Sequence, residues 1–257
     1  MYKDKKIIAV IPARENSKGI KKKNLIKLNG LPLISYSIDY AKKSKLIDRV
    51  FVSTDGTNIA SVSRKFGAEV VIRPKNLCND TIMPDHAVVH TIDYVKNFLN
   101  YSFDYVVFLQ PTTPLRQLGE LDKAIKYCVT EKFDTVFSSM DYKPFLWRKK
   151  KQYIYPVSFD PYRRKRRQII QDINETGSYY ITKKEAFKKF KNRFGKKISN
   201  YNSDFLSFFE IDTLSDYDYI KELFKTSILK NHKISLPKKI KWKYLLKLAW
   251  TTLEILS

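Results

Sequence analysis

The chain has 257 residues, 43% of them hydrophobic and 14% aromatic, which is enough to bury a large core and excludes a disordered chain. Its 49 basic and 26 acidic side chains give a formal net charge of +23, which favours an anionic partner: nucleic acid, an anionic membrane or a phosphorylated substrate. The two cysteines make no disulfide framework, and no apolar run suits a signal peptide or a membrane span, so a cytoplasmic location is expected.

Short apolar runs alternate with amphipathic segments along the first half of the chain. Runs rich in β-branched and aromatic residues predict buried strands over Ile7–Ile11, Val50–Ser53, Tyr105–Leu109 and Thr135–Ser139. Helical spacing predicts helices over Pro32–Lys43, Asn58–Phe66, Asp85–Leu99 and Leu118–Val129. This alternation predicts an α/β fold, a mainly parallel twisted sheet with helices on both faces. Ligands of such sheets bind beyond the carboxyl ends of the strands.

The second half of the chain is less regular. Residues 142–168 are aromatic and very basic, with the runs WRKKKQY and YRRKRRQ, and predict a basic arm or a β-excursion from the sheet. Strand character returns at 177–182 and at 205–212. Thr213 and Asp216 are favourable first residues for the helix that follows, and Pro237 opens a last helix.

The loop after the first predicted strand is rich in cations. Its sequence is IPARENSKGIKKKN, residues 11–24, and its basic residues are Arg14, Lys18, Lys21, Lys22 and Lys23. The seven glycines of the chain are too scattered for GxxxxGK[ST] or GxGxxG, so this loop must hold an anion mainly with side chains. The alternative is a solvated lysine-rich connection, and charge alone does not decide between the two.

The same loop closely resembles the nucleotide-binding loop of the cytidylyltransferases that activate sialic acid and related nonulosonic acids. Three later segments resemble further motifs of that family in the same order: FLQPTTPLR, RRQIIQDINETGSYYIT and EIDTLSDYDYI. The resemblance covers about residues 6–225. It implies a Rossmann-like nucleotide-diphospho-sugar transferase fold, with a catalytic domain over 1–228 and a C-terminal amphipathic helical extension over 229–257.

The resemblance implies transfer of CMP from CTP to the anomeric hydroxyl of a nonulosonic acid, with pyrophosphate as the second product and Mg²⁺ as the cofactor. It implies that Arg14, Lys18 and Lys23 bind the triphosphate. Fixed cations stabilise the charge that the leaving pyrophosphate gains. Asn24 contacts the nucleotide or only caps the turn, and Arg73 reads the cytosine edge or only forms a surface ion pair.

On the sugar side, the resemblance assigns Gln110, at the end of a predicted strand, and the aromatic Tyr180. Arg166 and Arg167 match the family's Arg-Gln pair with an ambiguity of one residue. Thr176 stands where sialate enzymes often have Asn before a glycine, which leaves the identity of the sugar open.

Glu210 and Asp212 are two residues apart on a predicted strand, so both side chains face the same way. Paired carboxylates suit a hard cation such as Mg²⁺, and the resemblance assigns the catalytic metal to these two. The family usually has Asp where this chain has Glu210, and Asp212 has an alternative role as a helix cap. Arg14, Lys23 and Asp212 are the catalytic candidates.

Other sequence features are weaker. His86 and His90 are one helical turn apart, but a third zinc ligand is not evident. The basic runs come without a nucleic-acid-binding signature, so no nucleic acid partner is expected. The alternatives to the leading function are a nucleotidyltransferase for another sugar acid, and a basic protein that binds nucleic acid or membrane on a nucleotidyltransferase scaffold.

The assembly is also predicted. The family commonly dimerises with the arm reaching the partner's site, so a homodimer or a higher homo-oligomer is expected. The segment KKIKWKYLLKLAWTTLEILS has an apolar surface too wide for a helix that rests on one neighbour. We expect it in a subunit contact, with peripheral contact to a membrane as the alternative.

Overall fold

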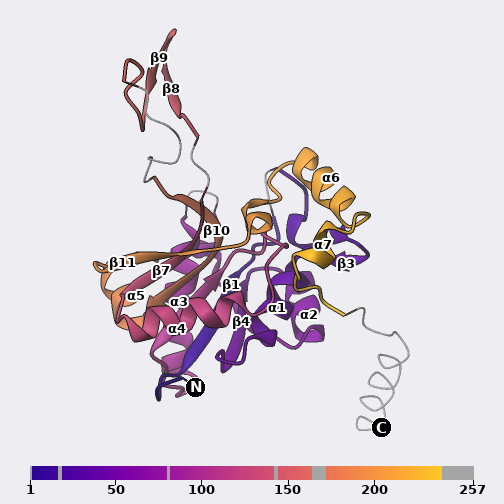
Figure 1. Cartoon of the computed structure of the whole chain (residues 1–257). Coiled ribbons are helices and arrows are strands. Elements are labelled where there is room, and N and C mark those ends of the chain that lie inside the picture. The colour runs from indigo at the N-terminus through magenta and orange to yellow at the C-terminus, as the bar shows by residue number, and fades with distance from the viewer. Residues whose placement is uncertain (1, 17–18, 80–81, 142–143, 164–171, 239–257) are drawn as a thin grey trace, which may run out of the picture.

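The computed structural model describes residues 2–16, 19–79, 82–141, 144–163 and 172–238. A seven-stranded sheet forms the centre of the molecule, in the spatial order β11-β7-β10-β6-β1-β4-β5 (Figure 1). These strands are β1 (Ile7–Pro12), β4 (Arg49–Thr54), β5 (Glu69–Ile72), β6 (Tyr105–Leu109), β7 (Thr135–Met140), β10 (Asn174–Lys183) and β11 (Ile198–Asn202). A two-stranded sheet pairs β2 (Lys27–Leu28) with β3 (Leu31–Pro32).

The main sheet is parallel except at one strand. β1 runs parallel to β4 and β6, β4 to β5, and β7 to β11, whereas β10 lies antiparallel between β6 and β7. The predicted α/β fold with a mainly parallel sheet is therefore confirmed. The carboxyl ends of β1, β4 and β6 lie at the same edge of the sheet, which is where a ligand of such a fold binds.

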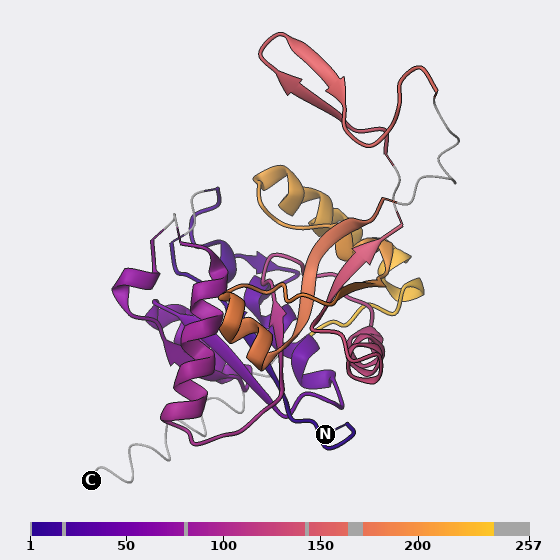
Figure 2. The same ribbon diagram turned by 90° about the vertical axis from the view of Figure 1, so that its left-hand side faces the viewer.

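Helices cover both faces of the sheet (Figures 1 and 2). They are α1 (Leu33–Lys43), α2 (Thr57–Lys65), α3 (Pro84–Asn97), α4 (Glu120–Thr130), α5 (Lys184–Phe190), α6 (Leu214–Leu223) and α7 (Ile228–Asn231). Short 3₁₀ turns are η1 (Lys23–Leu25), η2 (Lys75–Leu77) and η4 (Phe205–Phe208).

Helices on both faces of the sheet explain why the strand sequences are continuous apolar runs. Ile7, Ala9 and Ile11 of β1 pack with α1, α2 and α4, whereas Ile8 and Val10 pack with α3 and α5. A strand between two helical layers has no solvent face, so its sequence does not alternate. A third apolar cluster joins α1 to α6 and α7 beside the basic loop.

One predicted strand is wrong. Residues 205–212 form η4 and a loop, not a strand. Asp204 caps η4 by accepting a hydrogen bond from the backbone N–H of Leu206 at 2.9 Å, which stabilises a turn there. The N–H of Ile211 donates to the carbonyl of Thr112 at 2.9 Å, but the segment belongs to none of the sheets that the described residues form. The sequence prediction also missed α5 and β11.

The helix predicted after Asp212 is confirmed as α6. Thr213 is its N-cap, and the Asp216 carboxylate accepts from the backbone N–H of Thr213 at 2.7 Å in a capping box. The helix predicted after Pro237 lies outside the described residues. Helices within the described ranges include none that is both long and apolar enough to cross a membrane.

A β-hairpin projects away from the body of the molecule in both ribbon views (Figures 1 and 2). It pairs β8 (Trp147–Lys150) with β9 (Tyr153–Pro156) and lies within the segment for which the sequence predicts a basic arm. Its apolar side chains are exposed: Trp147 is 49%, Tyr153 69% and Ile154 63% accessible.

Candidate active site

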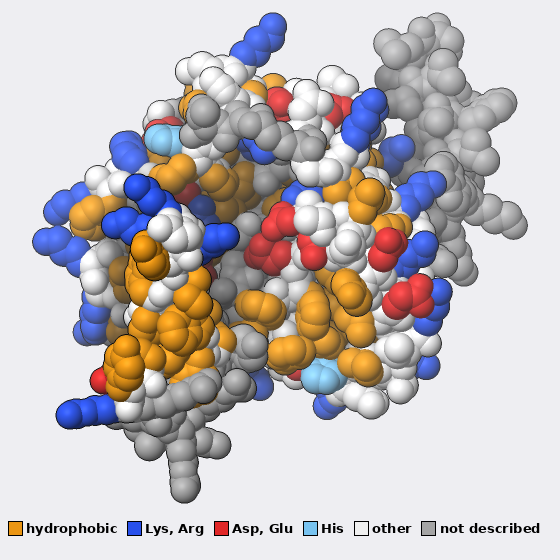
Figure 3. Space-filling view, turned by 90° about the horizontal axis from the view of Figure 1, so that it is seen from above, with side chains coloured by type: hydrophobic (Ala, Val, Ile, Leu, Met, Phe, Trp, Pro, Cys, Tyr) orange, Lys and Arg blue, Asp and Glu red, His pale blue; other side chains and the backbone are white. Residues whose placement is uncertain are grey.

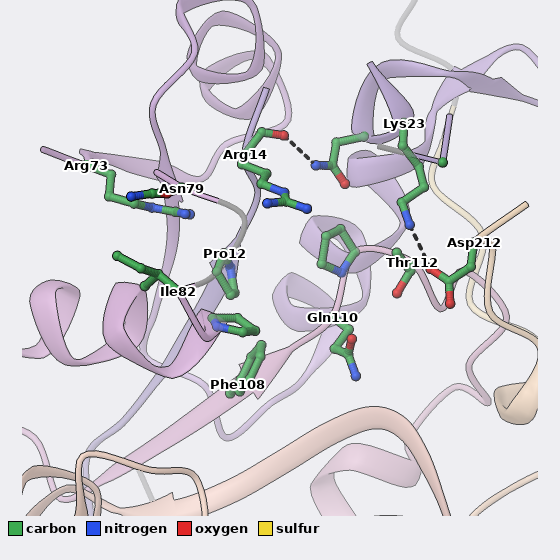
Figure 4. A pocket seen from close by; sticks show the side chains of 14 residues that line it. Pro12, Arg14, Lys23, Arg73, Asn79, Ile82, Phe108, Gln110, Thr112 and Asp212 are labelled. Carbon is green, nitrogen blue, oxygen red and sulfur yellow. Dashed lines mark hydrogen bonds and ion pairs between the residues drawn. The ribbon is translucent and has the colours of Figure 1, made fainter. Parts of the chain in front are cut away.

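A pocket of about 360 Å³, called pocket A, opens at the carboxyl ends of β1 and β6. Figure 4 shows Arg14 reaching into it between Arg73 on one side and Lys23 on the other. The basic loop contributes Arg14, Gly19, Lys23 and Asn24 to the lining, and the other lining residues are Pro12, Arg73, Asn79, Ile82, Pro84, Phe108, Gln110, Pro111, Thr112 and Asp212.

The basic loop is fixed against the segment that carries Asp212. The Lys23 ammonium pairs with the Asp212 carboxylate at 2.7 Å, although the two residues are 189 positions apart. A Cβ at Gly19 would lie 2.6 Å from the carbonyl oxygen of Asp212, so only glycine fits there without a shift. Lys18 of the same loop lies outside the described residues.

Asn24 stabilises the shape of the loop. Its side chain is 5% exposed, and its Nδ2 donates to the carbonyl oxygen of Arg14 at 2.9 Å. The structure thus favours the turn-stabilising alternative for Asn24, which also lines pocket A. By holding the backbone of Arg14, it directs that guanidinium into the pocket.

Arg73 is buried, so its alternative role as a surface ion pair is wrong. It is 8% exposed and donates from Nη2 to the carbonyl oxygen of Ser53 at 2.8 Å. Burial lowers the pKa of Arg73, with the nearby Asp55 carboxylate opposing that effect. The guanidinium is thereby held at the side of pocket A opposite Lys23 (Figure 4).

A second pocket, called pocket B, adjoins the first and has a volume of about 560 Å³. Gln110 and Asp212 line both pockets. The remaining lining residues of pocket B are Glu175, Thr176, Gly177, Tyr180, Phe208, Phe209, Glu210, Asp216, Tyr219 and Ile220. Among the lining residues that the structure describes, the charged ones are all carboxylates, so pocket B is acidic where pocket A is basic.

Glu210 and Asp212 both reach pocket B, although they lie on a loop and not on the predicted strand. Burial, and then the negative charge of Asp212, raise the pKa of Glu210 to about 7. Two carboxylates whose charges repel each other can take a cation between them. The cap alternative for Asp212 is wrong, because Thr213 caps α6 and Asp212 offers only its backbone N–H to Asp216.

Gly177 leaves room for the side chains of Glu210 and Gln110. Its φ is +68°, and a Cβ there would lie 2.1 Å from Glu210 Oε1 and 2.6 Å from Gln110 Nε2. A larger residue would push both side chains aside and would strain the backbone. The carboxylate of Glu210 and the amide of Gln110 therefore come together over a glycine of β10.

Thr176 and Tyr180 line pocket B with hydroxyls that already have protein partners. The Thr176 hydroxyl donates to Ser138 Oγ at 2.8 Å, and the Tyr180 hydroxyl donates to the Glu175 carboxylate. Both residues are almost fully buried, at 3% and 1% exposure. Arg166 and Arg167, the remaining candidates for the sugar side, lie outside the described residues.

Arg116 was not among the predicted site residues, although it ends the FLQPTTPLR motif. It is 1% exposed and donates to the carbonyl oxygens of Gln110 and Ser178, at 2.6 and 2.9 Å, and to the Ser37 hydroxyl at 3.0 Å. Burial lowers its pKa to about 10. Arg116 therefore fixes the backbone of Gln110 from beneath and lines neither pocket.

The pair of histidines has no support as a zinc site. Within the described residues, no group of three or more His, Cys, Asp and Glu side chains is placed to hold a metal ion. Burial lowers the pKa of His90, and the neighbouring Arg73 adds to this effect.

The fold has counterparts among solved structures. CMP:2-keto-3-deoxy-manno-octonic acid synthetase complexed with CTP aligns with a TM-score of 0.64 at 15% identity, over 86% of this chain and 98% of that one. The 4-diphosphocytidyl-2C-methyl-D-erythritol synthase of Anaerococcus prevotii aligns with a TM-score of 0.63 at 13% identity, over 86% and 99%. At these identities the likeness shows a shared fold.

The sequence shows the family to which the chain belongs. Residues 8–240 match the model of a family described as Cytidylyltransferase, and the chain belongs to this family. It is similar to N-acylneuraminate cytidylyltransferase of Escherichia coli O18:K1:H7, with 32% identity over 83% of this chain and 51% of that protein. It is also similar to a pseudaminic acid cytidylyltransferase of Campylobacter jejuni, with 27% identity over 86% of this chain and 97% of that protein. The chain thus spans about half the length of the first relative and nearly all of the second, and the predicted family is confirmed.

Proposed function

We propose that this protein transfers CMP from CTP to the anomeric hydroxyl of a nonulosonic acid, with a CMP-sugar and pyrophosphate as products. One observation carries the proposal: a basic pocket and an acidic pocket share Gln110 and Asp212, so that two substrates bound side by side would meet there. The names of the relatives, which concern N-acylneuraminate and pseudaminic acid, support this class of acceptor.

Pocket A is the proposed site of CTP. Arg14 and Lys23 supply positive charge to the triphosphate, and the pyrophosphate that leaves gains further negative charge as the bond to the α-phosphorus breaks. Because Asn24 and Asp212 hold these two cations in place, little reorganisation is needed as the charge develops. Arg73, at the opposite side of the pocket, is proposed to contact the cytosine edge.

Pocket B is the proposed site of the sugar acid. Gln110 lies at its border with pocket A and offers an amide to the sugar hydroxyls. Thr176 and Tyr180 are proposed to shape the walls of the pocket and not to hydrogen-bond the sugar. Their hydroxyls already donate to Ser138 and Glu175. Arg166 and Arg167 are proposed to meet the carboxylate of the sugar, as the family resemblance implies.

Glu210 and Asp212 are the proposed ligands of Mg²⁺. Both offer carboxylate oxygens, which Mg²⁺ prefers, and the charge of Asp212 contributes to the raised pKa of Glu210, a repulsion that a cation relieves. The donor set therefore fits the metal. Bound there, Mg²⁺ would neutralise phosphate oxygens. Lys23 pairs with Asp212 at 2.7 Å, so its ammonium lies between the proposed metal site and pocket A.

The protein is expected to release pyrophosphate from CTP only when a nonulosonic acid and a divalent cation are present. The test measures pyrophosphate for a panel of nonulosonic acids, each with the four nucleoside triphosphates, with an octulosonic acid as the control for another sugar acid. Turnover with the octulosonic acid alone would reassign the acceptor, and equal rates with ATP and GTP would contradict the assignment of pocket A to cytidine.

We also propose that the chain forms a homodimer through the β8–β9 hairpin. A two-stranded hairpin is marginally stable alone in water, yet this one exposes Trp147, Tyr153 and Ile154. Its strand β8 is basic, whereas pocket B is acidic, so a second copy offers a surface of complementary charge. In the view from above, hydrophobic side chains gather beside Lys and Arg, across a hollow from a group of Asp and Glu (Figure 3).

Replacing Tyr153 and Ile154 together by Asp is expected to convert a dimer into a monomer, because each would place a charge in the buried part of the contact. Sedimentation velocity measures the mass. The matched control is Phe98→Asp, which changes a side chain that is 76% exposed on the body of the molecule and should leave the dimer intact. A wild-type monomer, or a dimer that survives both hairpin substitutions, contradicts the proposal.

A cytosolic location remains a proposal, supported by Cys78 and Cys128, which are both unpaired thiols in the structure. The predicted roles of the C-terminal segment in assembly or membrane contact concern residues 239–257, which lie outside the described residues.

A further inference from the structure

An arginine lies beneath both pockets without lining either of them. Arg193 follows α5, and its guanidinium carbon is 4.5 Å from the ring centroid of Phe108 and 4.5 Å from that of Tyr180. Phe108 lines pocket A and Tyr180 lines pocket B. The two aromatic residues are direct partners across β6 and β10, with ring centroids 5.5 Å apart.

Asp85 fixes the position of this guanidinium. Its carboxylate accepts from Arg193 Nε at 3.1 Å, from Nη2 at 2.6 Å and from the backbone N–H of Arg193 at 2.8 Å. Asp85 is 1% exposed and lies in the first turn of α3, next to Pro84 of pocket A. A bidentate pair with a third bond to the backbone holds the guanidinium plane in one orientation.

The backbone of Arg193 is held as well. Its carbonyl oxygen accepts hydrogen bonds from the hydroxyls of Thr135 at 2.9 Å and Thr182 at 2.6 Å, on β7 and β10. The pair is therefore attached to the sheet at one end and to α3 at the other. Tyr180 in turn contacts Glu175: the Tyr180 hydroxyl donates a hydrogen bond to the Glu175 carboxylate, and both residues line pocket B.

We propose that Asp85 and Arg193 form a positioning pair that fixes Phe108 and Tyr180, and through them one wall of each substrate pocket. The inference rests on the proposed function for the identity of the two substrates. Neither residue touches a substrate: they act through the two rings, whose placement depends on a flat cation with one fixed orientation.

The test replaces Arg193 by Lys, which keeps the charge opposite the buried Asp85 carboxylate but loses the flat fork. The KM of the sugar acid is expected to rise by about tenfold and the Kd of CTP by a few-fold, with a smaller change in kcat, since displaced walls weaken binding of the ground state. Asp85→Asn should have the same effect, and the double variant should be no worse than either single one, because both act as one unit.

The chain offers a matched control in Arg49. This arginine pairs with Glu69 through Nε at 2.7 Å and lies 5.0 and 4.9 Å from the rings of Phe51 and Tyr101, but it is at the amino end of β4, away from both pockets. Arg49→Lys therefore makes the same chemical change elsewhere. It should leave KM and the Kd of CTP unchanged, even where it lowers Tm as much as Arg193→Lys.

Calorimetry of CTP binding, with Mg²⁺ and without any sugar, separates this inference from the proposed acceptor. If the wild type binds CTP and turns over no nonulosonic acid, the proposed function fails. The CTP affinities of the variants then still show whether the Asp85–Arg193 pair positions the wall of pocket A. Weaker CTP binding by Arg193→Lys and Asp85→Asn, but not by Arg49→Lys, supports the pair. Affinities and KM values within twofold of the wild type in both variants, with a native circular dichroism spectrum, overturn it.

Discussion

Asp212→Asn is expected to lower turnover by about 10³-fold while the fold survives. Asp212 lines both pockets, binds Lys23 and is one of two proposed ligands of Mg²⁺, so removing its charge affects the cation, the loop and the metal together. The amide has nearly the same size, and the side chain is 63% exposed, so little stability is lost. Steady-state pyrophosphate release and thermal unfolding measure the two effects.

The control for this substitution is Asp218→Asn, which makes the same change on an exposed position of α6 outside both pockets. It should retain wild-type turnover. Near-normal turnover of Asp212→Asn, with an unchanged dependence on Mg²⁺, would contradict both the metal assignment and the role of the Lys23–Asp212 pair.

The second large effect is expected at the basic loop. Arg14→Ala and Lys23→Ala should each lower kcat/KM by about 10²-fold or more, roughly 3 kcal/mol of lost charge stabilisation in the transition state. Arg14 reaches into pocket A, and Lys23 lines the side of the pocket opposite Arg73 (Figure 4).

Lys21→Ala is the internal control for the loop. Lys21 is exposed, does not line pocket A and lies only two residues from Lys23, so its removal should change kcat/KM by less than about twofold, as for an ordinary surface substitution. Equal small losses at all three positions would show that the loop is a solvated connection and that pocket A does not hold a triphosphate.

The central sheet was predictable because its strands lie between two helical layers. Such strands keep an apolar residue at nearly every position, as in Ile7–Pro12. This pattern can be recognised in the sequence without knowing which strands pair with one another. The run at 205–212 has similar composition but pairs with no strand among the described residues, and Leu206, Phe209 and Ile211 pack instead in the apolar cluster beside the basic loop. Strand β11 carries too few apolar residues to be distinguished from a loop.

The candidate site was predictable where it rests on local motifs and not where it rests on packing. Lys23 and Asp212 belong to segments with a recognisable resemblance, and the structure brings these residues together. Arg193 stands in an ordinary basic run, and its position under two aromatic rings depends on β6, β10 and α3 meeting in space. Arg116 was missed as a support because burial of a whole guanidinium is not visible in a sequence.

The contact between Lys23 and Asp212 also bears on how the molecule is made. The two residues are separated by 189 positions, so a ribosome must synthesise most of the chain before the ion pair can close. Strands β1, β4 and β5 are neighbours in the sheet, all lie within the first 72 residues, and can pair long before that. A nascent chain will therefore contain Arg14, Lys23 and Arg73 of pocket A before Asp212, the carboxylate of the same pocket, has been synthesised.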